Sequence, residues 1–531
     1  MIIEGPAMER AIADGSNADV VDICVIGSGV GGAVAAALLA ERGYSVLILD
    51  QGGYYHPARD FDQRELHMTP RLFGARGQLH SDDRGLTLRH GNNVGGSSVA
   101  GWATAQRAPE ARLRLWADRF GVTGHAAQDL ATAYGEIEAS LGVSLADDAH
   151  TNPLNARLFE GARALGWRAE RVPHARKNCQ KSGFCSQGCV YDAKQSMLVS
   201  YLPRAINAGA RIYADCHADM LLAQKRRFDY LVVKVVNRFN GQPTGSAFRV
   251  EARAFILAAG GIGTPTFLRR LGLGDRHPHV GEHLWFNPTS AVFGLFPEDV
   301  GQWRNIPAAW SIEEFRTSRH DPAAGTERSA PFGEQGAYTG GGFGITAHQA
   351  HPATLAAALP GHGPSHETLM RRFPRIGGTL ATLDDAEEGR LTLKDERRRI
   401  EAPMRGLNRL RLHDALARQA ALLLASGATE VLFGDARDTR VRDPSEIAAA
   451  VAALSDQPGA LPLRSGQIGG GARMGATEKE GVVGMDHRLH DTDNVYIADA
   501  SVFPTSLGVD TDLTVMAFSH LVANAVAANL G

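Results

Sequence analysis

The sequence has little cysteine and no large excess of charge of either sign. Five cysteines among 531 residues are few and odd in number, which suits a reducing cytoplasm and provides no disulfide framework. The formal net charge is −3, so neither nucleic acid nor an anionic membrane surface is an expected partner. These two features argue against a small disulfide-stabilised secreted domain and against a basic nucleic-acid-binding protein.

Long hydrophobic runs are also missing. No stretch reaches the roughly 18 consecutive apolar residues that a membrane-spanning helix needs. The first 19 residues have neither the basic region nor the apolar region of a secretory signal. We therefore expect a cytoplasmic protein without a membrane span.

Glycine, by contrast, is abundant. The 60 glycines exceed the average share of about 7%. They cluster in short loops, which indicates places where the backbone approaches another group closely. A chain of this length can form two or three domains or one interleaved architecture.

The most informative of these loops follows the first mainly apolar run, residues 20–26. Gly27, Gly29 and Gly32 form a G-x-G-x-x-G pattern, and an Ala/Leu-rich helix and a second strand follow, ending at Asp50. In such a unit the glycines permit the tight turn, the close approach of a pyrophosphate and the packing of helix on strand. The acidic residue accepts hydrogen bonds from a ribose. The pattern predicts a dinucleotide site and leaves FAD and NAD open.

Further motifs extend the pattern along nearly the whole chain. They are RHGNNVGGSSVAGWATAQRAP (89–109), ARAFILAAGGIGTPTFLRRLGLG (252–274), VGEHLWFNP (280–288), GRLTLKDERRRIEAP (389–403) and the segment from NVYIADAS to the last helix (494–530). In this order they resemble the glucose–methanol–choline (GMC) family of FAD-dependent oxidoreductases. The similarity is greatest to bacterial members related to cholesterol oxidase and gluconate-type dehydrogenases.

The resemblance implies an α/β fold in which a Rossmann-like FAD-binding domain is interleaved with an α+β substrate-binding domain. It also implies FAD as the cofactor, in an extended form. The ADP half would be held by Gly27, Gly29, Gly32 and Asp50, the pyrophosphate and flavin would lie along Gly95, Gly96, Ser97 and Ser98, and Asp499 and Ala500 would contact the pyrophosphate or ribityl chain. The final helix, beginning near Thr511, would point its N-terminus at the flavin ring, where a partial positive charge favours the reduced flavin.

The FAD-binding domain is expected to be discontinuous. We assign residues 20–130, 170–290 and 465–531 to it, and residues 131–169 and 291–464 to the substrate-binding domain. The Gly/Pro-rich stretch near 334–366 is expected to be a lid or substrate loop. Its four histidines are interpreted as ordinary residues of an exposed loop rather than metal ligands: His348, His351, His362 and His366.

Three cysteines gather in NCQKSGFCSQGCVYDAKQS, residues 178–196. Cys179, Cys185 and Cys189 could ligate zinc or an iron–sulfur cluster, but their spacing fits no standard cluster run and a fourth ligand is missing. We expect a structural loop with a labile disulfide and no metal.

The catalytic positions depart from the family pattern. A base must accept the hydroxyl proton while hydride moves to the flavin, and in the family this role falls to a His–His or His–Asn pair. Aligning GGARMG (470–475) puts Gln467 at the first position, and aligning DASVFPTSLGVD puts Asp510 at the second. Gln467 cannot take a proton, whereas burial would raise the pKa of Asp510 toward a useful range. Asn287, in WFNP, is a further candidate for contact with substrate or flavin.

Three functional hypotheses remain open. Asp510 could act as the base of an alcohol oxidation in which Gln467 orients the substrate oxygen. It could instead serve a desaturation, another C–H oxidation or an amine oxidation. The protein could also be a catalytically silent FAD-binding homologue, with Asp510 only a helix cap. Trp102 near the flavin would favour a small to medium hydrophobic substrate by stacking, and oxygen, a quinone or a redox protein could reoxidise the flavin.

Overall fold

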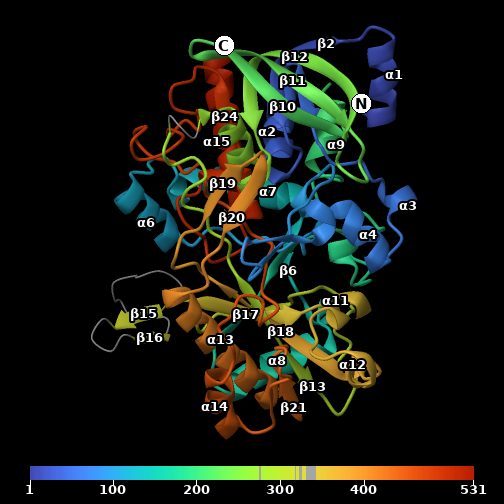
Figure 1. Cartoon of the computed structure of the whole chain (residues 1–531), viewed down its shortest axis with the longest axis vertical. Helices are drawn as coiled ribbons and strands as arrows, with labels where there is room; N and C mark the ends of the chain where they lie inside the picture. Colours follow the sequence, from blue (N-terminus) through green and yellow to red (C-terminus); the bar gives the residue numbers. More distant parts are fainter. Residues whose placement is uncertain (274–276, 317, 322–325, 330–341) are drawn as a thin grey trace.

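The computed structural model describes residues 1–273, 277–316, 318–321, 326–329 and 342–531. Two sheets lie at opposite ends of the long axis of the molecule, and both chain termini lie at the end of the first sheet (Figure 1).

The first sheet is the predicted Rossmann-like sheet. Its described strands follow the order β1-β9-β3-β2-β12-β11-β10, with β24 also paired to β12. The strands are β1 (Ile2–Ile3), β2 (Ala18–Ile26), β3 (Val46–Leu49), β9 (Arg211–Tyr213), β10 (Cys216–Gln224), β11 (Arg227–Val236), β12 (Pro243–Leu257) and β24 (Val495–Ile497). Pairing from β1 to β12 and on to β24 is parallel, whereas β10, β11 and β12 form an antiparallel meander. The side chains of the central parallel strands are mostly apolar, as expected for strands that helices cover on both faces of a sheet.

The helices around this sheet include the one that the glycine pattern predicts. They are α1 (Gly5–Ala13), α2 (Val30–Glu41), α6 (Glu110–Phe120), α7 (Ala127–Leu141), α9 (Tyr201–Asn207), α10 (Gly260–Arg270) and α15 (Asp512–Leu530). α2 is buried on nearly every side, since it packs against α9 and α15. α15 is long and apolar enough to cross a membrane by length and composition, but 56% of that window is buried inside the protein, where it packs against α2 and α7.

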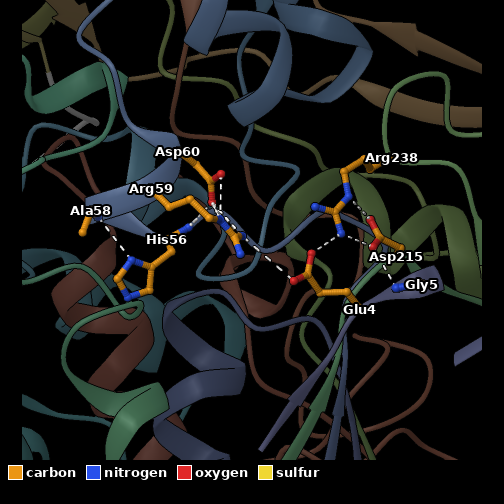
Figure 2. A network of polar contacts seen from close by, with 8 residues as sticks. All are labelled: Glu4, Gly5, His56, Ala58, Arg59, Asp60, Asp215 and Arg238. Atoms are coloured by element: carbon orange, nitrogen blue, oxygen red, sulfur yellow. Dashed lines mark hydrogen bonds and ion pairs between the residues drawn. The ribbon is translucent and has the colours of Figure 1, made fainter. Parts of the chain in front are cut away.

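The residues before position 20, where the predicted FAD-binding domain begins, also pack against the first sheet. β1 pairs with β9, and α1 packs on β11 and β12. Figure 2 shows the polar contacts that hold this segment: Arg238 donates to both oxygens of Asp215, at 3.0 and 2.5 Å, and to Glu4 at 2.6 Å, while the Gly5 amide donates to Asp215 at 3.0 Å. Arg59, in the short helix α3 (Pro57–Asp60) that follows β3, lies 4.0 Å from Glu4.

The second sheet is largely antiparallel and is covered on both faces. Its described strands are β4 (Leu79–His80), β5 (Thr87–Leu88), β23 (Arg464–Ser465), β13 (Thr289–Leu295), β18 (Ile376–Leu383), β17 (Phe343–His348), β14 (Trp310–Ile312) and β7 (Ala169–Arg171), with β21 (Glu430–Leu432) and β22 (Arg440–Val441) added beside β13. On β13, Val292 packs in the core under α8 and α13, whereas Phe293 and Leu295 pack under α11 and α12. This alternation is the period-2 pattern of a strand with two buried faces.

The elements around the second sheet are α8 (Pro153–Ala164), α11 (Pro352–Ala356), α12 (Gly363–Met370), α13 (Gly406–Ala425) and α14 (Ile447–Ala452), with the hairpins β15 (Ser318–Asp321) to β16 (Thr326–Ser329) and β19 (Arg390–Lys394) to β20 (Arg397–Glu401). Two expected boundaries shift. β4 and β5 lie in the second sheet although they fall within 20–130, and α7 packs in the first core although it extends past 130.

The Gly/Pro-rich stretch is more ordered than a loop. Residues 334–341 lie outside the described residues, but from residue 342 the stretch forms β17, α11 and most of the turn into α12. His348 and His351 are buried, so the interpretation of all four histidines as exposed is wrong. His348 is covered because β17 is a central strand of the second sheet, and His351 is covered by the cysteine-rich loop, where Phe184 stacks on its ring and its Nε2 lies 3.0 Å from the Gly183 oxygen.

Candidate functional site

The first cavity lies between the loop after β2, the 90–98 loop, the start of α10 and the segment after β24. Gly27 has φ +108°, and a Cβ there would meet the Ala258 carbonyl oxygen at 2.2 Å. A Cβ on Gly32 would meet the Gly27 oxygen at 2.0 Å, which is the close packing of helix on strand. A Cβ on Gly29 would meet nothing within 4 Å, so this residue leaves open space at the N-terminus of α2. The three glycines therefore have the geometry that a pyrophosphate-binding turn needs.

Two further glycine contacts bring distant loops together. A Cβ on Gly31 would lie 1.7 Å from the Ala498 oxygen, so α2 lies directly against the end of β24. Gly96 has φ +58°, and its Cβ would lie 2.8 Å from the Cα of Gly29. Gly95 also has a positive φ, of +96°. Gly31 is the first of the paired glycines after Val30, and the fingerprint includes only the second, Gly32.

Asp50 is placed where the fingerprint predicts, at the end of β3 and facing the loop after β2. Its Oδ2 accepts from the Ser28 amide at 3.0 Å and the Ser28 hydroxyl at 2.5 Å, and its Oδ1 accepts from the Gly52 amide at 2.8 Å. Burial raises its pKa to about 6, against the hydrogen bonds that lower it. The Ser28 oxygen also accepts from the Gly95 amide at 2.9 Å, which joins the two glycine loops.

Of the other expected cofactor residues, Gly95 is not part of the wall of the first cavity, whereas the remaining ones line it: Gly96, Ser97, Ser98, Asp499 and Ala500. Ser97 accepts from the Gly91 amide at 2.9 Å, and Ser98 donates to the Gly95 oxygen at 2.6 Å. Asp499 accepts from the Gly260 amide at 2.9 Å and the Thr264 hydroxyl at 2.5 Å, so its carboxylate holds the start of α10. Ala500 lies beside it on the cavity wall.

Unsatisfied polar atoms on the wall of this cavity fit a cofactor rich in hydrogen-bonding groups. Nε2 of His90, Oδ1 of Asn92 and Oδ1 of Asn93 are buried without a partner among the described residues, and all three residues line the cavity. Buried polar groups are otherwise almost always paired. Together with the open space at Gly29, they fit a bound dinucleotide. Sequence reasoning missed them, although RHGNN precedes the glycines that it used.

The three predicted catalytic residues form one hydrogen-bonded chain. Asn287 Nδ2 donates to Gln467 Oε1 at 2.9 Å, and Gln467 Nε2 donates to Asp510 Oδ2 at 3.3 Å. The same Asp510 oxygen accepts from the Thr104 hydroxyl at 2.6 Å, and Oδ1 accepts from the Asp512 amide at 3.1 Å. Asp510 thus accepts a hydrogen bond from the first amide of α15, although Thr511 is the N-cap residue, and it also faces Gln467, so a role at the helix end and a catalytic role are compatible.

Two carboxylates two residues apart make this corner electrostatically unusual. Burial raises the pKa of Asp510, whereas its hydrogen bonds from Thr104, Asp512 and Gln467 lower it. Burial and the neighbouring Asp510 carboxylate raise the pKa of Asp512 to about 8, and Lys194 opposes this. In the described part of the chain, hydrogen-bond donors reach the carboxylate of Asp510 but not that of Asp512, so this geometry favours the negative charge on Asp510.

The second cavity adjoins the first and has a volume of about 310 Å³. Ser97, Gly466, Gln467, Thr511 and Asp512 line both cavities, and Asn287 and Asp510 line the second. The final helix begins at Asp512 with Thr511 as its N-cap, so its N-terminus lies at the junction of the two cavities.

The wall of the second cavity combines apolar surface with many polar and charged side chains. Trp102 lines it, as predicted, but most of its neighbours there are polar or charged: Arg89, Thr104, Gln106, Gln187, Thr289, Ser311, Arg316, Thr346, His348, Gln349, Thr382 and Arg464. His283, four residues before Asn287 in the chain, lies in a different cavity, where its Nδ1 is 2.5 Å from Glu388.

The cysteine-rich loop supports the junction through a lysine. Cys179, Cys185 and Cys189 are all free thiols, and no group of three metal-ligating side chains occurs in the described part of the chain. The expected labile disulfide is therefore absent from the structure. Burial raises the pKa of Cys185 to about 12, which makes it a poor nucleophile. Lys194 Nζ donates to the carbonyl oxygens of Val99, Gly101 and Cys185 at 2.5, 3.0 and 2.6 Å.

The chain matches the GMC oxidoreductase family over most of its length. The N-terminal family pattern matches residues 21–289 and the C-terminal pattern residues 386–519. An uncharacterized GMC-type oxidoreductase of Mycobacterium tuberculosis is 28% identical, over 98% of this chain and 77% of its own length. A long-chain-alcohol oxidase of Arabidopsis thaliana is 27% identical over 95% of this chain, which spans 66% of that protein.

The fold is shared with solved structures at low sequence identity. Pyridoxine 4-oxidase from Mesorbium loti aligns with a TM-score of 0.69 and 15% identity, over 95% of this chain and 98% of that one. A formate oxidase variant of Aspergillus oryzae, described for its effect on FAD modification, aligns with a TM-score of 0.69 and 16% identity, over 97% and 99% of the two chains. The family patterns, the dinucleotide cavity and the junction at α15 lead to one conclusion: the chain belongs to the GMC oxidoreductase family and is an FAD-dependent oxidoreductase.

Proposed function

We propose that this protein oxidises the hydroxyl group of a small-molecule alcohol, with Asp510 as the proton acceptor and Gln467 as the group that holds the substrate oxygen. The observation that carries the proposal is the chain from Asn287 through Gln467 to Asp510 at the junction of the two cavities. Relatives whose names specify an alcohol, such as the long-chain-alcohol oxidase, support the same reaction class.

The direction of the hydrogen bonds assigns the roles. An ionised Asp510 only accepts, so Gln467 must donate to it through Nε2 and turn its oxygen to Asn287. The second Nε2 hydrogen of Gln467 is then free to bind the oxygen of an alkoxide. Asp510 is within reach of the same oxygen's proton, because both side chains face the second cavity.

Bound FAD supplies the acceptor for the hydride that leaves the carbinol carbon. The chain's own contribution is to hold the alcohol at the junction, to remove the hydroxyl proton at Asp510 and to keep Asp512 protonated. A protonated Asp512 adds no second negative charge beside the forming alkoxide, which would otherwise oppose the loss of the proton.

Flavin reduction measured anaerobically with a panel of alcohols, ketones and amines tests the proposal. An alcohol should bleach the flavin band, and Asp510→Asn should lower that rate about 10² to 10⁴-fold while FAD content stays the same. Asp512→Asn is the matched control, because it removes the neighbouring carboxyl group and leaves Asp510 in place.

Three outcomes would contradict the proposal. Bleaching only by amines or ketones would make the reaction class wrong. An Asp510→Asn variant that reacts as fast as the parent would place the base elsewhere, and a loss of rate confined to Asp512→Asn would make Asp512 the base.

A further inference from the structure

Two arginines stand side by side on the wall of the second cavity. Arg89 follows β5 and Arg464 begins β23, and these two strands pair in parallel. The Arg89 amide donates to the Ser465 oxygen at 2.7 Å, which fixes the two segments against each other. Burial lowers the pKa of both guanidinium groups. Arg89 lowers the pKa of Arg464 further, to about 10, and the Glu65 carboxylate opposes both shifts.

Neither arginine has a carboxylate partner. Among the described residues, no ion pair or side-chain hydrogen bond joins either guanidinium to an acid, and Nε of Arg89 is buried without any partner. The nearby acid is Glu65, but its two oxygens accept from the Ala353 and Thr354 amides at 2.6 and 3.0 Å and so hold the start of α11.

The other charged groups on this wall are accounted for. Arg316 is matched by Glu313, its near neighbour in sequence, at 2.5 Å. The acids on the wall are Asp510 and Asp512, which belong to the reaction centre and lie outside ion-pair distance of Arg89 and Arg464. The two arginines therefore leave an excess of positive charge in this part of the cavity.

A histidine beside them shows the effect of that charge. His348, on β17, is buried, lines the same cavity and has an Nδ1 without a partner in the described part of the chain. Burial, with Arg464 and Arg89 as further causes, lowers its pKa to about 3, so it is a neutral imidazole. A neutral imidazole can donate one further hydrogen bond to an anion.

An unmatched pair of enclosed cations destabilises a folded protein, because the charges lose water and repel each other. Such an arrangement is expected where a ligand supplies the missing negative charge. The planar guanidinium group suits carboxylate and phosphate oxygens, which it binds through two parallel hydrogen bonds.

We propose that Arg89 and Arg464 bind an oxyanion carried by the substrate, so that the alcohol oxidised here is an anionic hydroxy compound, a hydroxycarboxylate or a hydroxyalkyl phosphate. This rests on the proposed alcohol oxidation, because Arg464 lies on the segment that ends at Gln467 and both side chains face one cavity. It replaces the expectation of a hydrophobic substrate.

Matched six-carbon substrates test the proposal on the FAD-loaded enzyme. Anaerobic flavin reduction is measured with 1-hexanol, 6-hydroxyhexanoate and 6-hydroxyhexyl phosphate, and binding of hexanoate, which has no hydroxyl group, is followed by the flavin spectrum. At least one anionic alcohol should show an apparent Kd about tenfold or more below that of 1-hexanol, since a hydrogen bond to a charged group is worth that factor. The tighter of the two identifies the anionic group.

Variants assign the effect to the two arginines. Arg464→Gln and Arg89→Gln should each abolish most of the preference and weaken hexanoate binding, whereas the rate with saturating 1-hexanol stays within about twofold. Arg464→Lys keeps the charge and should keep part of the preference. Arg372→Gln, at an exposed position on the second domain, is the matched control and should change nothing. FAD content and thermal midpoint establish that each variant is folded.

The outcomes separate this inference from the function it rests on. If alcohols reduce the flavin without preference for an anion, or the preference survives both glutamine variants, the anion site is wrong and the alcohol oxidation stands. If hexanoate binds in an Arg464-dependent way but no alcohol reduces the flavin, the anion site stands and the alcohol oxidation is wrong.

Discussion

The two adjoining cavities are built on opposite principles. In the first cavity Asp50 is hydrogen-bonded by Ser28 and Asp499 by Thr264, and the shape depends on glycines such as Gly27 and Gly31, whose Cβ atoms would meet backbone at 2.2 and 1.7 Å. The second cavity is distinguished instead by Arg89 and Arg464, which have no carboxylate partner among the described residues. The first is specified by backbone geometry and the second by charge.

Gly31→Ala should break the first cavity most severely. Its Cβ would lie 1.7 Å from the Ala498 oxygen, and backbone cannot yield as a flexible side chain does. We expect a loss of about 3 kcal/mol or more of stability, seen as insoluble protein or a protein without FAD. Gly29→Ala is the control, since its Cβ would meet no protein atom within 4 Å. It should fold and lose mainly FAD affinity, and equal damage from both variants would contradict this distinction.

Asp215→Asn tests what a matched charge contributes in the first domain. It leaves Arg238 without the bidentate partner that it has in Figure 2. Removing one member of a buried pair costs about 3–5 kcal/mol, measured by chemical unfolding. Arg59→Gln, at a largely exposed pair, should cost less than about 1 kcal/mol.

Arg464→Gln should change the stability in the opposite direction to Asp215→Asn. Because its charge is enclosed, unmatched and close to Arg89, its removal should stabilise the ligand-free protein by about 1 kcal/mol. Thermal and chemical unfolding measure the change. If this variant loses stability as Asp215→Asn does, Arg464 is a structural residue and the contrast between the two regions is wrong.

The pH dependence of stability tests the carboxylate pair. The pKa of Asp512 is raised to about 8 in the folded protein against 3.8 as its ordinary value. A raised acid pKa means that the folded state holds the proton more tightly, so this stabilisation is complete below about pH 4 and is lost as the pH rises through 8. Asp512→Asn, which stays neutral, should be less sensitive to pH over this window, and a parallel pH profile for both proteins would contradict the assignment.

Thr104→Val should give the smallest effect. It removes the 2.6 Å hydrogen bond that favours ionised Asp510, so the pKa of Asp510 should rise and the acidic limb of the rate profile should move to higher pH. At high pH the rate should fall less than about tenfold. A rate lost equally at every pH would instead show that Thr104 only positions the loop.

Local motifs predicted much of the first cavity. The turn at Gly27, Gly29 and Gly32 and the carboxylate of Asp50 lie where the spacing placed them, because a strand, turn and helix are close in sequence. Gln467 was found because family motifs surround it. Gly31 was missed, because nothing local shows that α2 lies against the end of β24.

The histidines of the Gly/Pro-rich stretch show the limit of composition as a guide. The glycine and proline content predicted an exposed loop. His348 instead lies on β17, a central strand of the second sheet, and its side chain is buried. Burial depends on partners from elsewhere in the chain, which composition does not record.

The sequence by itself determined the dinucleotide-binding turn and the family, since each depends on motifs whose parts are close in the chain, and it singled out Asn287, Gln467 and Asp510 as catalytic candidates. Only the tertiary structure decided the charge of the second cavity. Arg89 and Arg464 are single residues in unrelated segments, and they become a pair only because β5 and β23 are neighbours in one sheet. The two charges repel each other, and no carboxylate among the described residues forms an ion pair with them. Neither feature can be read from one stretch of the sequence.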